Sequence, residues 1–193
     1  TALFGVDDGN QTAPFSVTTA TSFFQVSPPS GANLGSDVNP VFFATVPDLE
    51  SDSWLAVGAG PGEPGEIMEI GMDDAWAGFN SGSGFSVESL AGAMILSMPG
   101  STPSAVSGED GKVLIAQLTT NGGLSLLVSI QYKDAVGDAQ QVMGLTYNIE
   151  AEVSGCTNET ACNYDAAATL DDGSCEELDE CGECGGDGLC FTC

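Results

Sequence analysis

The chain has 193 residues with 28 acidic side chains, two lysines, no arginine and no histidine, so its formal charge is −26. Nucleic acids and anionic membrane surfaces are excluded as partners, because binding either requires clustered basic side chains. Without histidine, Ser-His-Asp and Cys-His catalytic arrangements are excluded as well. No apolar run reaches the roughly 18 residues that cross a bilayer, so no membrane insertion is expected.

Residues 1–35 are predicted to form an extended N-terminal arm. Apolar patches alternate here with acidic and Thr-rich stretches, and Phe15, Val17 and Phe23 lie on one face of an extended strand. A Pro-Pro pair at 28–29 then projects the arm away from the domain. Such an arm either pairs within its own domain or adds a strand to the sheet of a neighbouring copy.

Residues 36–153 are predicted to form an all-β domain, an antiparallel β-sandwich of the jelly-roll or immunoglobulin-like kind. Apolar residues alternate with polar or small ones along 124–132 and 143–149, the period of half-buried strands. The run 112–118 is apolar on both faces, which indicates a central strand. Asn121-Gly122 follows it and predicts a hairpin. Further strands are predicted at 40–46, 53–58, 66–71, 84–88 and 92–98. The only helical turn is predicted near 86–91.

We predict that the chain is not an enzyme. Carboxylate pairs near an aromatic ring, the pattern of a glycosidase, occur at Asp73-Asp74 beside Trp76 and at Glu66 with Glu69. With 28 acidic residues, such a pair is expected by chance. No motif positions an acid against a base.

Residues 154–193 are predicted to be an acidic, disulfide-rich module. All the cysteines lie here, and the first 155 residues have none. The Cys181-x-x-Cys184 pair has acidic neighbours that disfavour a reactive thiolate. With the last two cysteines it would also suit a four-thiolate zinc site, but structural disulfides are favoured. The predicted disulfide cysteines are Cys156, Cys162, Cys175, Cys181, Cys184, Cys190 and Cys193. Because there are seven cysteines, one of them is left without a partner in this set and is either free or bonded to a cysteine outside it.

A disulfide-rich module indicates an extracellular or cell-surface location. Two N-x-[ST] signals, at Asn10 and Asn158, fit that location and predict covalent glycans. Because the chain begins at Thr1, we expect that a signal peptide was removed or that residues are missing before it.

The acidic loop of the module predicts a calcium site. Asn163, Asp165, Asp171 and Asp172 supply hard oxygen ligands in a loop short enough to wrap one Ca²⁺ ion, and Asp187 could contribute to a second site. The register of an EF-hand is absent. The alternative is that these are solvated turn residues. The need to offset repulsion between carboxylates favours a bound cation.

The segment GCTNETACNYDAAATLDDGSC at 155–175, followed by DECGECGGDG at 179–188, resembles cysteine-rich repeats found near the C-termini of secreted and surface proteins of aquatic bacteria. More loosely, residues 49–58 resemble the β-domain that precedes those repeats. Proteins of this kind are similar to subunits of glycosylated extracellular fibrils from environmental water. The resemblance implies a structural rather than a catalytic role.

Two classes of function follow. The first is a structural subunit of an extracellular glycosylated filament or surface assembly, which polymerises with copies of itself through arm exchange and tail contacts. The alternative is a monomeric, calcium-dependent adhesion or carbohydrate-binding module, in which Trp54 or Trp76 stacks on a sugar ring.

Overall fold

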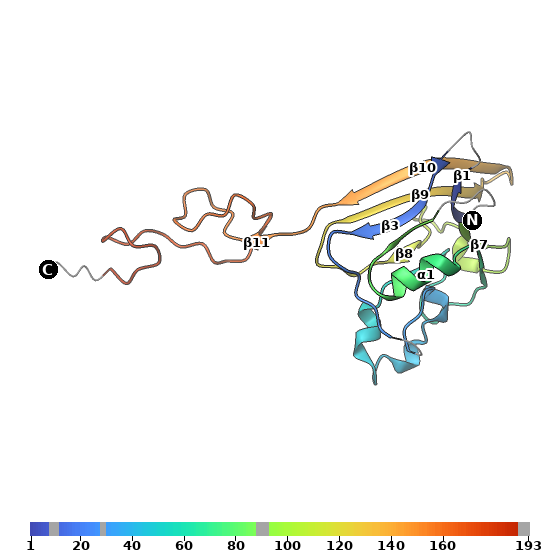
Figure 1. Ribbon diagram of the computed structural model, residues 1–193, viewed down its shortest axis with the longest axis horizontal. Coiled ribbons are helices and arrows are strands. Elements are labelled where there is room, and N and C mark those ends of the chain that lie inside the picture. The colour runs from blue at the N-terminus through green and yellow to red at the C-terminus, as the bar shows by residue number, and fades with distance from the viewer. Residues whose placement is uncertain (8–11, 28–29, 88–92, 189–193) are drawn as a thin grey trace. The chain divides into compact units, whose positions relative to one another are not determined.

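The computed structural model of the chain describes residues 1–7, 12–27, 30–87 and 93–188 (Figure 1). Asn10, the Pro-Pro pair, Cys190 and Cys193 therefore lie outside the described residues. The chain divides into two compact units, Thr1–Glu150 and Ala151–Cys193.

A large antiparallel sheet dominates the first unit. Its strands are β1 (Ala2–Asp7), β2 (Thr12–Ala13), β3 (Phe15–Thr19), β5 (Ile67–Ile70), β6 (Phe85–Val87), β7 (Ala93–Ser97), β9 (Leu124–Lys133) and β10 (Ala139–Ile149). The order is β5-β7-β1-β9-β3-β6, with β10 paired to β9 and β2 paired to β1. A second, two-stranded sheet joins β4 (Trp54–Leu55) to β8 (Ala116–Gln117). These pairings confirm a mostly β fold with antiparallel strands.

The N-terminal segment does not project as an arm. It contributes β1, which lies between β7 and β9, with Leu3 opposite both Ile95 and Ile130. β1 pairs with one part of β9, and β3 pairs with the next part of β9 along the same edge. The side chains of Phe15 and Val17 are fully buried there. The predicted alternation is therefore present, and the apolar face packs into the unit's own core, which is the first of the two alternatives expected.

Two strand predictions in the middle of the chain are wrong. Residues 40–46 begin with a 3₁₀ helix at Pro40–Phe42, where the Asn39 side chain accepts a hydrogen bond from the Val41 N–H at 3.0 Å. Proline fits the first turn of a helix because it has no N–H to leave unpaired. The run 112–118 contributes only β8, which pairs with β4 in the small sheet and is not central. The other 3₁₀ helices are Gly35–Asp37, Pro47–Ser51 and Pro103–Ala105.

The predicted Asn121-Gly122 hairpin is also wrong. Residues on its two sides go to different sheets, since β8 pairs with β4 whereas β9 pairs with β1, β3 and β10. The long hairpin is instead β9–β10. The Asp134 carboxylate organises its turn by accepting bonds from the Gln140 side chain and from the N–H groups of Asp138 and Val136. These bonds, chiefly that from Gln140, lower the pKa of Asp134.

One helix, α1 (Asp73–Asn80), was not predicted. Its two aspartates lie in the first turn, where negative charge interacts favourably with the helix dipole. Trp76 and Phe79, three residues apart, are buried on one side. The helix is followed by Gly82, whose φ of 83° requires a glycine. At eight residues, α1 is too short to show a clear helical period in the sequence.

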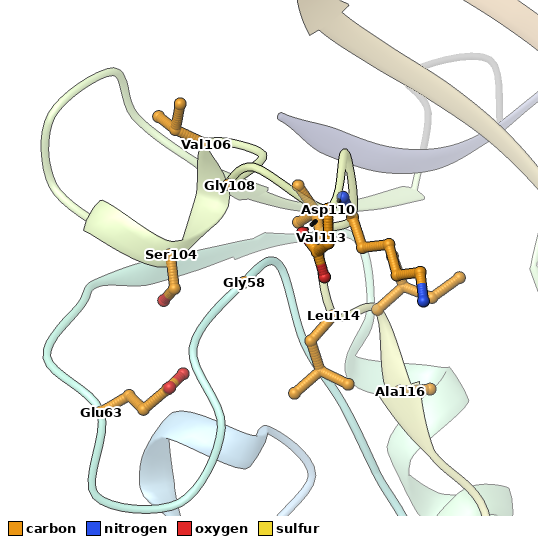
Figure 2. A pocket seen from close by; sticks show the side chains of 11 residues that line it. Gly58, Glu63, Ser104, Val106, Gly108, Asp110, Val113, Leu114 and Ala116 are labelled. Carbon is orange, nitrogen blue, oxygen red and sulfur yellow. Dashed lines mark hydrogen bonds between the residues drawn. The ribbon is translucent and has the colours of Figure 1, made fainter.

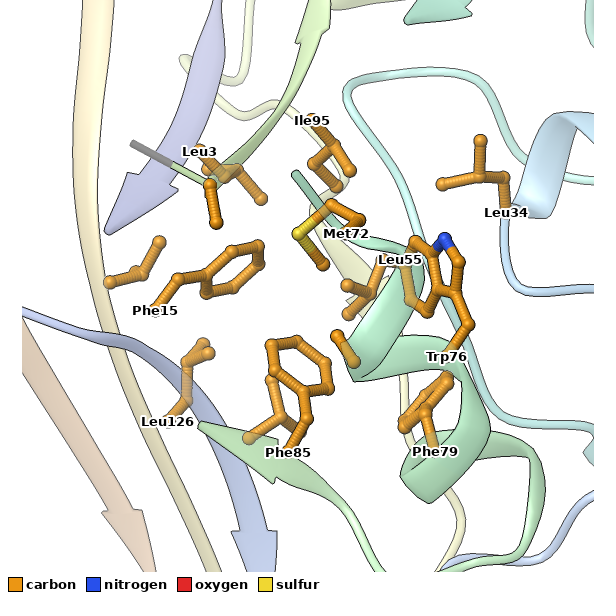
Figure 3. Packing of buried hydrophobic residues seen from close by; sticks show 14 of the residues in the cluster. Leu3, Phe15, Leu34, Leu55, Met72, Trp76, Phe79, Phe85, Ile95 and Leu126 are labelled. Atoms are coloured by element: carbon orange, nitrogen blue, oxygen red, sulfur yellow. The ribbon is translucent and has the colours of Figure 1, made fainter. Parts of the chain in front are cut away.

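Aromatic side chains form the centre of the core between the sheet and α1 (Figure 3). The rings of Phe15 and Phe85 meet edge to face, with centroids 5.2 Å apart. Phe79 contacts three further rings, those of Phe23, Trp76 and Phe85, at 5.8 to 6.0 Å. Such contacts add to the stabilisation from apolar burial. The core therefore joins the N-terminal strands to the helix.

Asp52 is a fully buried carboxylate that holds the connection after β3. Its Oδ1 accepts a hydrogen bond from the Val26 N–H at 2.7 Å, and its Oδ2 accepts one from the Ala32 N–H at 3.3 Å. Burial raises the pKa of Asp52, although these bonds act in the opposite direction. One side chain thus binds the residues on both sides of the segment that contains the Pro-Pro pair.

We expect Asp52→Asn to change how stability depends on pH. Because the folded-state pKa is raised above 3.8, the folded protein binds this proton more tightly than the unfolded chain does. The contribution of Asp52 is therefore greatest below pH 3.8 and is lost as the pH rises through the raised value. The free energy of unfolding of the wild type minus that of Asp52→Asn should decrease with pH, measured by urea denaturation. A difference that grows with pH would contradict this.

Candidate functional site

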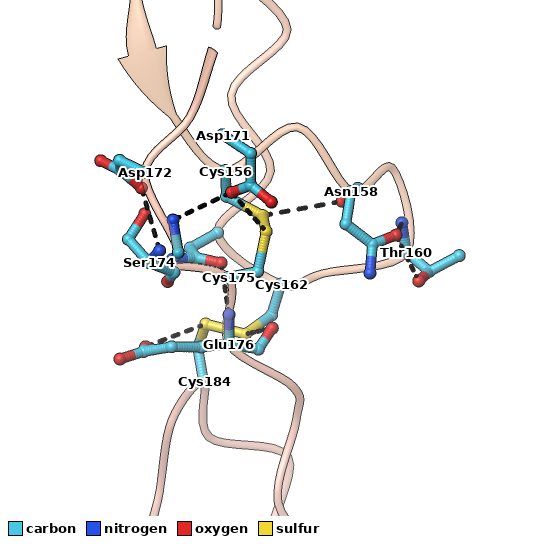
Figure 4. Close-up of a disulfide and its surroundings, with 12 residues drawn as sticks. Cys156, Asn158, Thr160, Cys162, Asp171, Asp172, Ser174, Cys175, Glu176 and Cys184 are labelled. Carbon is cyan, nitrogen blue, oxygen red and sulfur yellow. Dashed lines mark hydrogen bonds between the residues drawn. A yellow bond between two sulfur atoms is a disulfide. The ribbon is translucent and has the colours of Figure 1, made fainter.

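The C-terminal unit is held by disulfide bonds (Figure 4). Cys156 bonds to Cys175 and Cys162 bonds to Cys184, with Cα atoms 4.7 and 5.6 Å apart. Cys181 is also disulfide-bonded. Because Cys184 bonds to Cys162, the C-x-x-C pair is neither a redox dithiol nor half of a four-thiolate zinc site. The preference for structural disulfides is confirmed for these cysteines.

Little apolar burial supports this unit. Cys156 and Ala161 are its buried apolar residues among those described. Its regular structure is the short parallel pair β11 (Ser154–Gly155) and β12 (Leu170–Asp171). A chain segment of this size cannot bury enough apolar surface to fold by that means alone. The disulfide bonds therefore hold this unit in its folded conformation.

The predicted calcium ligands mostly form turns. Asp165, Asp171 and Asp172 each accept a hydrogen bond from a backbone N–H two residues further along, at 2.9 to 3.1 Å. Asn163 accepts one from the Glu176 N–H at 2.8 Å. No group of three or more acidic, histidine or cysteine side chains suited to a metal occurs among the described residues. Calcium binding at this loop stays a prediction, as does a role for Asp187.

Asp179 has a structural role that the sequence interpretation missed. Its Oδ1 accepts hydrogen bonds from the Cys181 and Glu183 N–H groups, both at 2.8 Å, and its Oδ2 accepts one from Gly188 at 3.2 Å. These bonds, led by that from Glu183, lower the pKa of Asp179. The signal in the sequence was an aspartate two residues before a cysteine, a position from which it caps a turn. This carboxylate thus shapes the loop that carries Cys181 and Cys184.

The glycosylation signal at Asn158 lies on an exposed loop of the same unit. Its Oδ1 accepts hydrogen bonds from the N–H of Thr160 at 3.0 Å and from the hydroxyl of Thr160 at 2.8 Å (Figure 4). The side chain is therefore exposed on the surface of this unit. That it carries a glycan stays a prediction.

Three of the acidic residues considered for catalysis can be placed in the first unit. Asp73 and Asp74 lie in the first turn of α1, and Glu69 accepts a hydrogen bond from the indole N–H of Trp76. Trp54 and Trp76 are only 3% and 8% exposed. Neither ring offers a face to a sugar, so the stacking platform predicted for a carbohydrate-binding module is wrong.

A cleft with a volume of about 630 Å³ lies elsewhere in the first unit (Figure 2). It brings Glu63, Asp110 and Lys112 together with the apolar side chains of Val106 and Leu114. This cleft was not predicted from the sequence, because its walls come from two segments that are distant in the chain, 58–63 and 104–116. The buried hydroxyl of Ser104 has no hydrogen-bond partner among the described residues. We assign no chemistry to this cleft.

Comparisons with protein families, with curated proteins and with solved structures found no significant match to this chain. None of the helices in the described residues is long and apolar enough to cross a membrane.

Proposed function

We propose that the protein is a structural subunit of an extracellular, glycosylated filament or surface assembly, and that it polymerises by exchanging β1 between copies. The observation that carries this proposal is the position of β1. β1 lies inside the sheet, paired to β7 on one edge and to β9 on the other. The same two edges can be paired by β1 of a second copy.

The contacts that β1 makes in its own chain could equally be made by β1 of a neighbouring copy. Leu3 is 2% exposed, the Ser97 N–H donates to the Thr1 carbonyl at 3.0 Å, and the Thr1 hydroxyl donates to the Ala105 carbonyl at 3.0 Å. An unoccupied slot between β7 and β9 would expose apolar surface and two unpaired strand edges. A neighbour's β1 would fill it with identical contacts, and repetition would build an open head-to-tail chain.

The C-terminal unit supports the extracellular part of the proposal. Its disulfides persist in oxidising compartments, and its Asn158 signal is exposed. In the assembly we assign the first unit, whose expected arrangement is a β-sandwich, to the backbone of the filament. The C-terminal unit then makes the tail contacts between copies and carries glycan.

We expect Ala2→Cys combined with Gln131→Cys to give covalent multimers. These positions lie opposite each other on β1 and β9. If β1 is donated, the new disulfide joins two chains, and oxidised assemblies should run as a ladder on a non-reducing gel. If β1 stays in its own chain, only an internally cross-linked monomer will appear, which would overturn strand exchange.

The matched control is Gln141→Cys combined with Gln131→Cys. Gln141 lies opposite Gln131 across the β9–β10 hairpin, and their side chains are hydrogen-bonded at 3.3 Å. A hairpin closes within one chain, so this pair should yield cross-linked monomer. A ladder from the control as well would show that the cysteines react nonspecifically.

A further inference from the structure

The outer edge of β10 is open. This strand has 11 residues and pairs with β9, and no strand of the described residues pairs with its other edge. Edge strands are normally protected by charge, proline or a covering segment. From Ala139 to Ile149 there is neither a charged residue nor a proline, in a chain with 28 acidic residues.

The side of β10 that continues the core face is apolar and exposed. Val142, Leu145 and Tyr147 lie opposite the core-facing residues Ile130, Val128 and Leu126 of β9. Tyr147 is nevertheless 51% exposed, and Ile149 is 62% exposed. The apolar face of the sheet therefore extends beyond the residues that cover it. An open edge beside an apolar face is suited to strand addition.

A bulge divides the edge into two parts. The register with β9 shifts between Val142 and Leu145, where Gly144 has a φ of 61° and donates its N–H to the Ser129 hydroxyl at 3.0 Å. Bulges interrupt strand pairing. The regular segment available to a partner is thus Leu145–Ile149.

We propose that Leu145–Ile149 pairs antiparallel with the same segment of a second copy, about a two-fold axis at Tyr147. Tyr147 then meets Tyr147 of the second copy, and Leu145 meets Ile149 of the second copy. Aromatic pairs directly opposite each other stabilise antiparallel strands. The pairing also places the apolar side chains of the two copies side by side on the combined sheet.

The segment is complementary to itself, because its apolar residues Leu145, Tyr147 and Ile149 meet one another about the axis, and this argues for a second copy as the partner. Local charge favours this register, since Leu145–Ile149 carries no charged residue in a chain with a formal charge of −26. With Tyr147 at the axis, Glu150 lies opposite Gly144 of the second copy. Pairing over the whole length of β10 would instead place Asp138 opposite Glu150, and like charges in that position are destabilising. The axis at Tyr147 avoids that repulsion.

The contact is small. Five residues a side bury far less than the roughly 1,200 Å² of a stable interface. We therefore assign it to lateral association, in which many weak contacts act together along assembled chains. It is separate from β1 exchange, because β1 and β10 lie on opposite sides of β9.

The test is oxidation of a Tyr147→Cys variant of the full chain. Residue 147 meets itself at the axis, so a disulfide-linked dimer should form about tenfold more readily than in the parent chain or in Gln140→Cys. Gln140 lies on the same face of β10 but before the bulge. The absence of a dimer, or equal dimer from both variants, would overturn the proposal.

A second variant separates this contact from strand exchange. Tyr147→Glu places two carboxylates opposite each other at the axis, and Gln140→Glu adds the same charge elsewhere on the strand. Under the electron microscope, Tyr147→Glu should leave single filaments that no longer associate side by side. Bundles that persist in Tyr147→Glu would contradict the proposed contact. The dimer of Tyr147→Cys is expected even if β1 is not exchanged, so the two proposals fail independently.

Discussion

Replacing both Cys156 and Cys175 by serine is expected to unfold the C-terminal unit. The first unit, Thr1–Glu150, here called the β unit, should stay folded. This disulfide joins residues 19 positions apart in the sequence. Closing a loop of that length lowers the entropy of the unfolded chain and so stabilises the folded unit by about 3 kcal/mol. The unit has almost no buried apolar surface to replace that contribution. The β unit is a separate compact unit, so we expect its stability to be independent of this bond.

Hydrogen exchange read by mass spectrometry measures both units in one sample. Amides from 151 to 188 should lose their protection, whereas those of β9 and α1 should keep theirs. The matched control is the double serine variant of Cys162 and Cys184, which opens a loop of similar length. A tail that stays protected in either variant would show that hydrogen bonds such as those of Asp179 suffice to hold it.

Phe79→Ala is expected to destabilise the β unit by about 3 to 5 kcal/mol. Phe79 is completely buried and contacts the rings of Phe23, Trp76 and Phe85. Truncation removes these contacts and leaves a cavity among large rigid rings, which cannot collapse to fill it. Because a small domain has roughly 5 to 15 kcal/mol of total stability, this one change removes a large share of it.

Urea denaturation followed by tryptophan fluorescence reports the loss, since Trp76 lies in the same cluster. The control is Phe42→Ala, whose side chain is 50% exposed and should cost less than about 0.5 kcal/mol. Equal effects from the two variants would mean that the aromatic cluster is not the centre of the core.

The sequence allowed the β class, the long strands and the disulfide unit to be predicted. The alternation of apolar residues along 124–132 and 143–149 corresponds to β9 and β10, and the concentration of cysteines after residue 155 corresponds to the stapled unit. Both signals are local. A strand with one buried face needs a period of two, and a segment too small for a core needs cross-links.

Pairing between distant segments could not be predicted. The apolar run 112–118 suggested a central strand, but the centre is occupied by β1 and β9, and β8 pairs only with β4. Asn121-Gly122 favours a tight hairpin locally, yet its flanks join different sheets. A local preference for a strand or a hairpin is overridden when a different pairing buries more apolar surface.

Charge, the position of the cysteines and the period of the strands can thus be read from the sequence, because each depends on residue type and spacing along the chain. The burial of Trp54 and Trp76, the place of the N-terminal segment inside the sheet and the place of β10 at its edge are known only from the packed fold. Those outcomes depend on which surfaces meet, and burial is a property of the whole packed unit rather than of any one segment.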